Sequence, residues 1–241
     1  MNAPMIRIRR ASDRGHADHG WLETFHTFSF AEYFDHKHMG FGSLRVLNQD
    51  RIHAGRGFAA HDHENMEIVT VLQQGILEHT DSTGTASRMV PGDVQLMSAG
   101  TGIRHSEANA SSTESLELLQ MWIMPRELGT SPRYEQRNFG LDPCDGNLQL
   151  VASPDGAKNS LTIGQDACLF MGRLATDQML RHRMTPGTIL WVHLARGHMK
   201  LNGKLLGPGD GAAVRDERDL EFRATDPVQF VAWELSDQDQ H

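Results

Sequence analysis

Short apolar segments, separated by turns that contain glycine or proline, recur along the whole chain. In many of them apolar and polar residues alternate, which is the pattern of a β-strand, because successive side chains point to opposite faces. Long helical periodicity is mostly missing, so an all-β fold built as a sandwich or closed barrels is predicted. Ten such strands are expected at residues 6–8, 44–47, 66–72, 94–97, 116–124, 148–152, 168–174, 188–194, 198–201 and 228–235.

Two segments depart from this pattern. Residues 131–137 are a candidate for one of a few short helices, because Pro132 suits the first turn of a helix. Residues 21–33 are rich in aromatic side chains and are expected to form an irregular loop.

A turn motif suggests that the chain contains two similar units. Val90-Pro-Gly-Asp93 precedes an expected strand in the first half, and Gly207-Pro-Gly-Asp210 does so in the second, 117 residues later. Each unit then has about half the chain, which is the size of a small β-barrel. We predict an N-terminal domain at 1–130, a connection at 131–145 and a C-terminal domain at 146–241.

Composition and charge exclude several classes of protein. Hydrophobic residues make up 39% of the 241 residues, enough for a folded core, and no apolar run reaches the roughly 20 residues that span a bilayer. The formal charge of −8 disfavours nucleic acid as a partner, since it repels phosphate. The N-terminus lacks the apolar stretch of a secretory signal, and Cys144 and Cys168 have no C-x-x-C spacing. A cytoplasmic protein with reduced thiols is therefore expected.

Residues of metal-ligand type occur in two pairs with strand spacing. His61 and His63 are two residues apart, as are His105 and Glu107, so each pair lies on one face of its strand. Two such pairs facing each other across a barrel supply three imidazoles and one carboxylate to one ion, a set that suits Fe, Mn, Co, Ni, Cu or Zn. The remaining early histidines, His16, His19, His36 and His38, are expected on the surface.

A second carboxylate competes for the fourth ligand position. Glu67 lies four residues after His63, on the same strand parity, so spacing alone does not choose between Glu67 and Glu107.

Several long motifs, in order, resemble the pirin family of two-domain cupins. They are residues 26–35 (HTFSFAEYFD), 38–48 (HMGFGSLRVLN), 61–67 (HDHENME), 98–107 (SAGTGIRHSE), 120–125 (QMWIMP) and 132–137 (PRYEQR). The resemblance is nearest to bacterial pirin-like proteins with quercetin 2,3-dioxygenase activity, and it implies a bicupin fold with the metal in the N-terminal barrel.

The resemblance also implies site residues and a function. Its ligands match His61, His63, His105 and Glu107, whereas general cupins often use the residue that matches Glu67. One divalent ion per chain is implied; iron is expected, with Cu, Ni, Co, Mn or Zn as alternatives. The implied activity is ring opening of a flavonol such as quercetin with O2, with Glu107 as both ligand and base in a monomeric enzyme.

Two other functions compete with this interpretation. A non-enzymatic iron-binding regulator would act through a protein partner, as eukaryotic pirins do. A sugar-phosphate isomerase of the same fold would need a basic cluster near the site, and Arg104 is its only support.

The second unit is expected to hold no metal. The 117-residue offset puts Phe222 at the position of His105 and Ala224 at that of Glu107. His182 is the one histidine near the other pair, and His193 and His198 are expected to be structural or surface residues.

Overall fold

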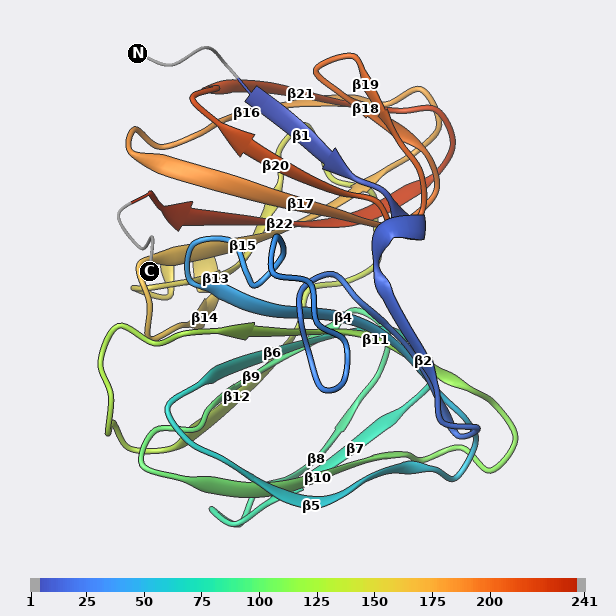
Figure 1. The fold of residues 1–241 in the computed structure, drawn as a ribbon, viewed down its shortest axis with the longest axis vertical. Coiled ribbons are helices and arrows are strands. Elements are labelled where there is room, and N and C mark those ends of the chain that lie inside the picture. Colours follow the sequence, from blue (N-terminus) through green and yellow to red (C-terminus); the bar gives the residue numbers. More distant parts are fainter. Residues whose placement is uncertain (1–4, 238–241) are drawn as a thin grey trace.

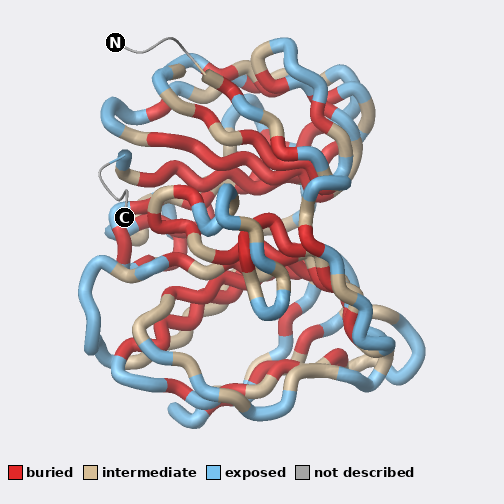
Figure 2. Tube along the Cα trace, in the orientation of Figure 1, coloured by how far each residue is buried: buried red, intermediate tan, exposed pale blue. Residues whose placement is uncertain are grey.

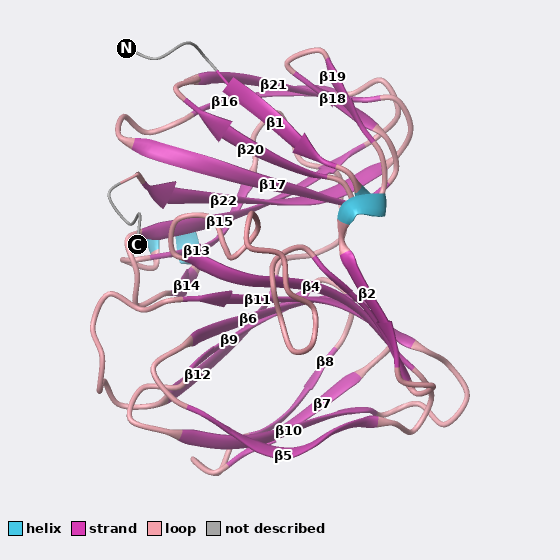
Figure 3. Ribbon diagram, in the orientation of Figure 1, coloured by secondary structure: helices cyan, strands magenta, loops and turns pink. Residues whose placement is uncertain are grey.

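The computed structural model describes residues 5–237. These residues contain twenty-two β-strands and two short 3₁₀ turns, η1 (Ala11–Asp13) and η2 (Ala157–Asn159) (Figure 3). They form two stacked β-barrels, each made of a seven-stranded and a four-stranded sheet (Figure 1). The all-β prediction is confirmed, and a strand is present at each of the ten expected positions. No helix within the described residues is long and apolar enough to span a bilayer.

The first barrel contains eleven strands. Its seven-stranded sheet runs in the order β12 (Arg133–Asn138), β9 (Asp93–Ser98), β6 (Glu67–Gln74), β11 (Leu116–Ile123), β4 (Leu44–Ile52), β3 (Leu22–His26) and β2 (Gly15–Asp18). Its four-stranded sheet runs β5 (Gly57–His63), β10 (Ile103–Asn109), β7 (Leu77–Asp81) and β8 (Ala86–Met89).

The second barrel repeats this order. Its seven-stranded sheet runs β1 (Met5–Arg9), β20 (Gly211–Arg215), β17 (Thr188–Arg196), β22 (Val228–Ser236), β15 (Ala167–Leu174), β13 (Gln149–Ser153) and β14 (Leu161–Thr162). Its four-stranded sheet runs β16 (Met179–Arg183), β21 (Asp219–Ala224), β18 (Met199–Leu201) and β19 (Lys204–Leu206).

The two Pro-Gly-Asp turns have the same structure. The Asp93 carboxylate accepts the backbone N–H of Val90 at 2.8 Å, and the Asp210 carboxylate accepts that of Gly207 at 3.0 Å. Gly92 and Gly209 have φ values of 95° and 82°, a conformation that glycine adopts without strain. Each turn leads into an equivalent strand, β9 or β20, so the internal repeat reflects two copies of one barrel.

Two local predictions were wrong. Residues 133–138 form strand β12, not a helix, because this polar segment pairs along its whole length with β9. Part of the expected loop at 21–33 is strand β3, in which Leu22, Thr24 and His26 are buried on one face. In both cases pairing with a neighbouring strand outweighed the local composition.

Strand pairing also differs from the predicted domain limits. The N-terminal strand β1 pairs with β20 and so belongs to the second barrel, at the top of Figure 1. Strand β12, within the predicted connection, completes the first barrel. Residues 1–4 and 238–241 of the predicted domains lie outside the described residues.

The largest apolar cluster lies between the two barrels, where the seven-stranded sheets pack against each other (Figure 2). It includes Leu119 and Met121 of β11 and Val231 and Trp233 of β22. The indole N–H of Trp233 donates to the sulfur of Met121 at 3.1 Å. Each large side chain buried here contributes about 1.5–3 kcal/mol, so this apolar contact stabilises the packing of one barrel on the other.

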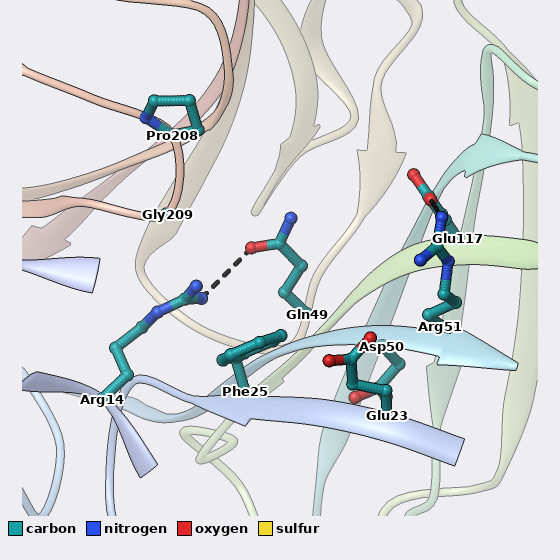
Figure 4. A pocket seen from close by; sticks show the side chains of 9 residues that line it. All are labelled: Arg14, Glu23, Phe25, Gln49, Asp50, Arg51, Glu117, Pro208 and Gly209. Carbon is teal, nitrogen blue, oxygen red and sulfur yellow. Dashed lines mark hydrogen bonds and ion pairs between the residues drawn. The ribbon is translucent and has the colours of Figure 1, made fainter. Parts of the chain in front are cut away.

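A small cavity of about 240 Å³ opens at one edge of this interface, where Arg14 donates to Gln49 at 3.1 Å and Pro208 and Gly209 approach from the second barrel (Figure 4). Glu117 at its far side binds Arg51 of its own barrel at 3.2 Å and Arg196 of the second barrel at 2.8 Å. This ion-pair group links the barrels at the rim of the apolar interface.

The interiors of the two barrels differ in polarity. The second is filled by an apolar cluster that includes Phe222 and Phe230. The first buries, among other polar side chains, Asn48, Gln95 and Glu107. Buried polar groups cost free energy unless they are paired, so their concentration in one barrel indicates a site.

Asp50, inside the first barrel, is buried and should make stability depend on pH. Burial raises the pKa of Asp50 to about 7, against the opposing effect of a hydrogen bond from Thr24 at 2.5 Å. The folded protein therefore binds this proton more tightly than the unfolded chain, and stability should fall as the pH rises from about 4 to about 7. We expect Asp50→Asn to remove the part of this fall that Asp50 causes and to raise the free energy of unfolding at pH 8 by up to about 4 kcal/mol. Urea unfolding of both proteins at pH 5 and pH 8 checks this. An equal fall in the free energy of unfolding of the variant and of wild type would contradict it.

Candidate metal centre

Three imidazoles converge inside the first barrel. Strands β5 and β10 are antiparallel neighbours, and His61 and His105 are directly paired. His63 lies on the same face of β5 as His61. The ring centroids are 4.5 Å apart for His61 and His105, 4.8 Å for His61 and His63, and 5.0 Å for His63 and His105. Their ligand nitrogens all lie within 4.8 Å of one another, close enough to bind one ion.

Glu107 lies deeper in the barrel, in a second group that shares His105. A carboxylate oxygen of Glu107 and nitrogens of His105 and His79 lie within 4.8 Å of one another. His79 belongs to β7, which pairs with the other edge of β10, and it is directly paired with Glu107. The Glu107 carboxylate accepts N–H groups from Gln95 at 3.2 Å and from Gln120 at 3.0 Å.

The surroundings of His63 and His105 favour the neutral imidazole, the form that binds a metal. Burial lowers the pKa of His105 to about 3, and the neighbouring His61 and His63 lower it further. Burial and His61 lower the pKa of His63 to about 4. His61 Nδ1 donates to the carbonyl of Ala59 at 2.8 Å, which leaves the lone pair of Nε2 free. Burial also raises the pKa of Glu107.

The buried nitrogens of this group fit a metal ion. Both ring nitrogens of His105 are buried and have no hydrogen-bond partner among the described residues, and neither has Nδ1 of His79. A buried unpaired nitrogen costs about 1–3 kcal/mol, and ligation of an ion by His105 would remove that cost for one nitrogen. The donor set of imidazoles and a carboxylate suits a divalent transition metal.

Glu67, the alternative ligand, lies elsewhere. Its carboxylate accepts the hydroxyl of Ser98 at 2.8 Å and the backbone N–H of Gly164, from the second barrel, at 3.0 Å. Arg133 forms an ion pair with it at 3.6 Å. Glu67 therefore links the two barrels and is not among the groups of converging ligand atoms in the described residues.

Sequence reasoning missed the residues that surround Glu107. Gln95, Thr70 and Gln120 are paired in one row across β9, β6 and β11 and face the four-stranded sheet. His79 and Asp81 are two residues apart on one face of β7, and His79 Nε2 contacts the Asp81 carboxylate at 3.0 Å. That i, i+2 spacing was the available signal for the pair, since it matches the spacing of the ligand pairs.

A cavity of about 560 Å³ leads from the surface to the histidines. Its wall is aromatic, formed by Trp21, Phe30, Phe58 and Trp122, and His61, His63, Glu107 and Gln120 also line it. The volume lies within the range of small-molecule sites, and the wall suits a flat, apolar ring system.

The second barrel keeps a histidine, His182, at the position of His63 but has apolar residues at the positions of His61, His105 and Glu107. Strand pairing aligns β21 with β10 and β16 with β5, which places Phe222 opposite Leu180 as His105 lies opposite His61. The row of Gln95, Thr70 and Gln120 becomes Ala212, Val192 and Ala232. Both groups of converging metal-ligand side chains in the described residues lie in the first barrel.

The other histidines have separate surroundings. His182 contacts Glu234 at 2.9 Å, His198 contacts Asp226 at 2.8 Å, and His193 is fully buried. His16, His19 and His36 are exposed, and His38 contacts Asp35 at 2.8 Å. Cys144 and Cys168 are free thiols.

Replacement of His182 by alanine should leave metal content unchanged, because its partner is Glu234 and its neighbours at ligand positions are apolar. Elemental analysis of the purified variant checks the metal. A loss of more than about tenfold in kcat/KM, or about 1.4 kcal/mol of transition-state stabilisation, would show that the second barrel takes part in the chemistry.

Two stacked barrels with one converging set of imidazoles define a bicupin with a candidate metal centre. The family model described as pirin matches residues 7–123, and that described as the quercetinase C-terminal cupin domain matches residues 150–235. The chain belongs to the pirin family.

Relatives and solved structures agree over nearly the whole chain. The chain is 46% identical to the quercetin 2,3-dioxygenase of Escherichia coli, over 96% of this chain and 99% of that protein. It is 36% identical to a pirin-like protein of Caulobacter vibrioides, over 94% and 98%. The crystal structure of the bacterial pirin YhhW of Escherichia coli in complex with nickel(II) has a TM-score of 0.91 at 44% identity and covers 96% of this chain and 99% of that one.

Proposed function

We propose that this protein is a metal-dependent dioxygenase that opens the central ring of quercetin-like flavonols with O2. The observation that carries the proposal is the aromatic cavity that ends on His61, His63 and Glu107. A flavonol is flat and aromatic, and this cavity offers it apolar walls and a metal-ligand floor. Support comes from the related proteins named quercetin 2,3-dioxygenase.

The residues of the site would have three roles: binding the metal, accepting a proton and holding the substrate. His61, His63, His105 and Glu107 would hold one divalent ion, with iron as the expected metal. The ion would supply Lewis-acid chemistry, lowering the pKa of a flavonol hydroxyl. Glu107 would accept the proton of that hydroxyl at its carboxylate, which Gln95 and Gln120 hold. Trp21, Phe30 and Trp122 would hold the flavonol rings and exclude water. Loss of carbon monoxide from the opened ring completes the reaction.

An oxygen electrode tests the proposal. Protein stripped with a chelator is loaded separately with Fe²⁺, Ni²⁺, Co²⁺, Cu²⁺, Mn²⁺ or Zn²⁺, and metal content and O2 uptake with quercetin are measured on the same samples. We expect at least one loaded form to consume O2 and release CO in proportion to the quercetin lost, and the stripped form to do neither. Full metal occupancy without O2 uptake in any form would overturn the proposal and favour the iron-binding regulator.

The sugar-phosphate alternative finds little support in the geometry. The Arg104 guanidinium binds the Asp62 carboxylate at 3.0 Å and the carbonyl of Ala60 at 3.0 Å. Its charge is therefore already paired. A monomeric state and a cytoplasmic location are part of the proposal, and light scattering of the purified protein tests the first.

A further inference from the structure

Two glutamine amides hold the buried Glu107 carboxylate. Gln95 donates to Oε1 at 3.2 Å and Gln120 donates to Oε2 at 3.0 Å, while Glu107 is only 1% exposed. Each contact requires that the amide turn its NH2 end toward Glu107. The oxygen and nitrogen ends of an amide have nearly the same shape, so packing alone does not decide which end faces the carboxylate.

Trp122 and Glu107 together set the orientation of Gln120. The indole Nε1 lies 3.2 Å from Gln120 Oε1, and an indole N–H is a donor only. It therefore binds the oxygen end of the amide, which leaves the NH2 end for Glu107. In the turned amide, N–H would face N–H at Trp122 and oxygen would face oxygen at Glu107.

The surroundings of Trp122 fix the position of its N–H. Its ring packs edge-on against His63 at 5.0 Å and against Phe30 at 5.3 Å. Its backbone is paired on both sides, with Ile68 of β6 and Val46 of β4. Trp122 thus holds a fixed donor between the cavity wall and the Glu107 amide.

The orientation of the Gln95 amide, on the other side of the carboxylate, is less strictly determined. The Tyr134 hydroxyl contacts Gln95 Oε1 at 3.1 Å but also Gln136 Oε1 at 2.9 Å and Ser87 at 2.5 Å. Its single proton is shared among these oxygens, whereas the indole N–H of Trp122 has one acceptor among the described residues.

We propose that Trp122 is a positioning residue for Glu107: it orients the Gln120 amide, which in turn fixes the carboxylate for the metal. This role is additional to its place in the cavity wall, and it rests on the proposed role of Glu107 as a ligand. Removal of the indole N–H leaves the contact with Glu107 as the remaining constraint on the Gln120 amide, so the amide and the carboxylate it binds are held less firmly.

The cavity wall offers a matched control. Trp21 also lines the cavity, packs edge-on against Phe58 at 5.3 Å, and makes no side-chain contact with Gln120 among the described interactions. Trp122→Phe and Trp21→Phe therefore make the same change to the wall, but only the first removes the donor to Gln120.

The experiment uses Co²⁺ as the probe on the full chain. Affinity is measured by competition with a chelator, and ligand geometry by the visible absorption of bound Co²⁺. We expect Trp122→Phe to weaken Co²⁺ binding about 10–100-fold and to change the spectrum, as loss of a group that orients a ligand does, and Trp21→Phe to change neither. Trp122→Tyr replaces Trp122→Phe if the latter does not fold.

A double-mutant cycle separates this role from general packing. If Trp122 acts through Gln120, then Trp122→Phe has no further effect on Co²⁺ affinity in a Gln120→Leu background. Additive effects, or equal Co²⁺ binding by Trp122→Phe and wild type, would overturn the proposal. These readouts do not need turnover, so they stand even if quercetin is not a substrate. Unchanged Co²⁺ affinity and spectrum in Glu107→Gln would instead refute the ligand role on which the proposal rests.

Discussion

The double variant His61→Ala, His63→Ala should bind no transition metal at the first-barrel site, whereas wild type should bind one ion per chain. The three imidazoles of His61, His63 and His105 have ligand nitrogens within 4.8 Å of one another, and the double variant retains one of them. Each lost imidazole removes a metal bond that neither solvent nor the apolar wall replaces with equal strength. O2 uptake with quercetin should be lost with the metal.

The measurement is elemental analysis of chelator-stripped, reloaded and desalted protein, with circular dichroism to check the fold. His36→Ala is the control, since His36 is exposed and outside the converging groups. Two ions per wild-type chain, or undiminished metal in the double variant, would contradict the prediction. An ion retained by the variant would point to the group formed by His79, His105 and Glu107.

Glu107→Gln should lower activity by about 10²- to 10⁴-fold, the usual loss when a general base is removed. The substitution keeps the size of the side chain but removes its negative charge, so metal affinity should fall as well. The three histidines remain, and partial metal occupancy is expected. Metal and O2 uptake are therefore measured on the same samples, so that lost metal is not mistaken for a lost base.

Glu67→Gln is the paired comparison, because residue spacing alone made Glu67 and Glu107 equally good candidates for the fourth ligand. Glu67 contacts Ser98 and Gly164 and lies outside the converging groups, so its substitution should spare metal binding. It weakens charge-assisted hydrogen bonds between the barrels, and we expect a loss of about 1–3 kcal/mol in the free energy of unfolding. If Glu67→Gln stripped the ion and Glu107→Gln behaved like wild type, the assignment of the ligands would be reversed.

The histidine part of the candidate site could be predicted because it depends on local geometry. The spacing of His61 and His63 places both on one face of any strand, whatever surrounds it. The same rule gave equal weight to Glu67 and Glu107, because strand parity says nothing about which strand lies opposite. Only the fold shows that Glu67 points to Gly164 in the other barrel.

Spacing gave no signal for Gln95 and Gln120, and it could not place His79 beside Glu107. Each reaches Glu107 through the pairing of strands that are distant along the chain: β7 beside β10, and β9 and β11 on either side of β6. Register between such strands depends on turns and on packing of the whole barrel. For the same reason β12 was mistaken for a helix: its polar residues gain their pairing only when β9 is present.

The amino-acid sequence alone predicted the all-β class, the two-fold repeat, the His61 and His63 pair, and Phe222 and Ala224 at two of the ligand positions in the second half. All of these follow from strand periodicity and from residue type at a fixed offset, which are properties of short segments. The tertiary structure decided that β1 is an edge strand of the second barrel and β12 an edge strand of the first. It also decided the separation of Glu67 from the imidazoles and the orientation of the Glu107 carboxylate. These depend on contacts between segments far apart in sequence, which exist only once both seven-stranded sheets have formed and packed together.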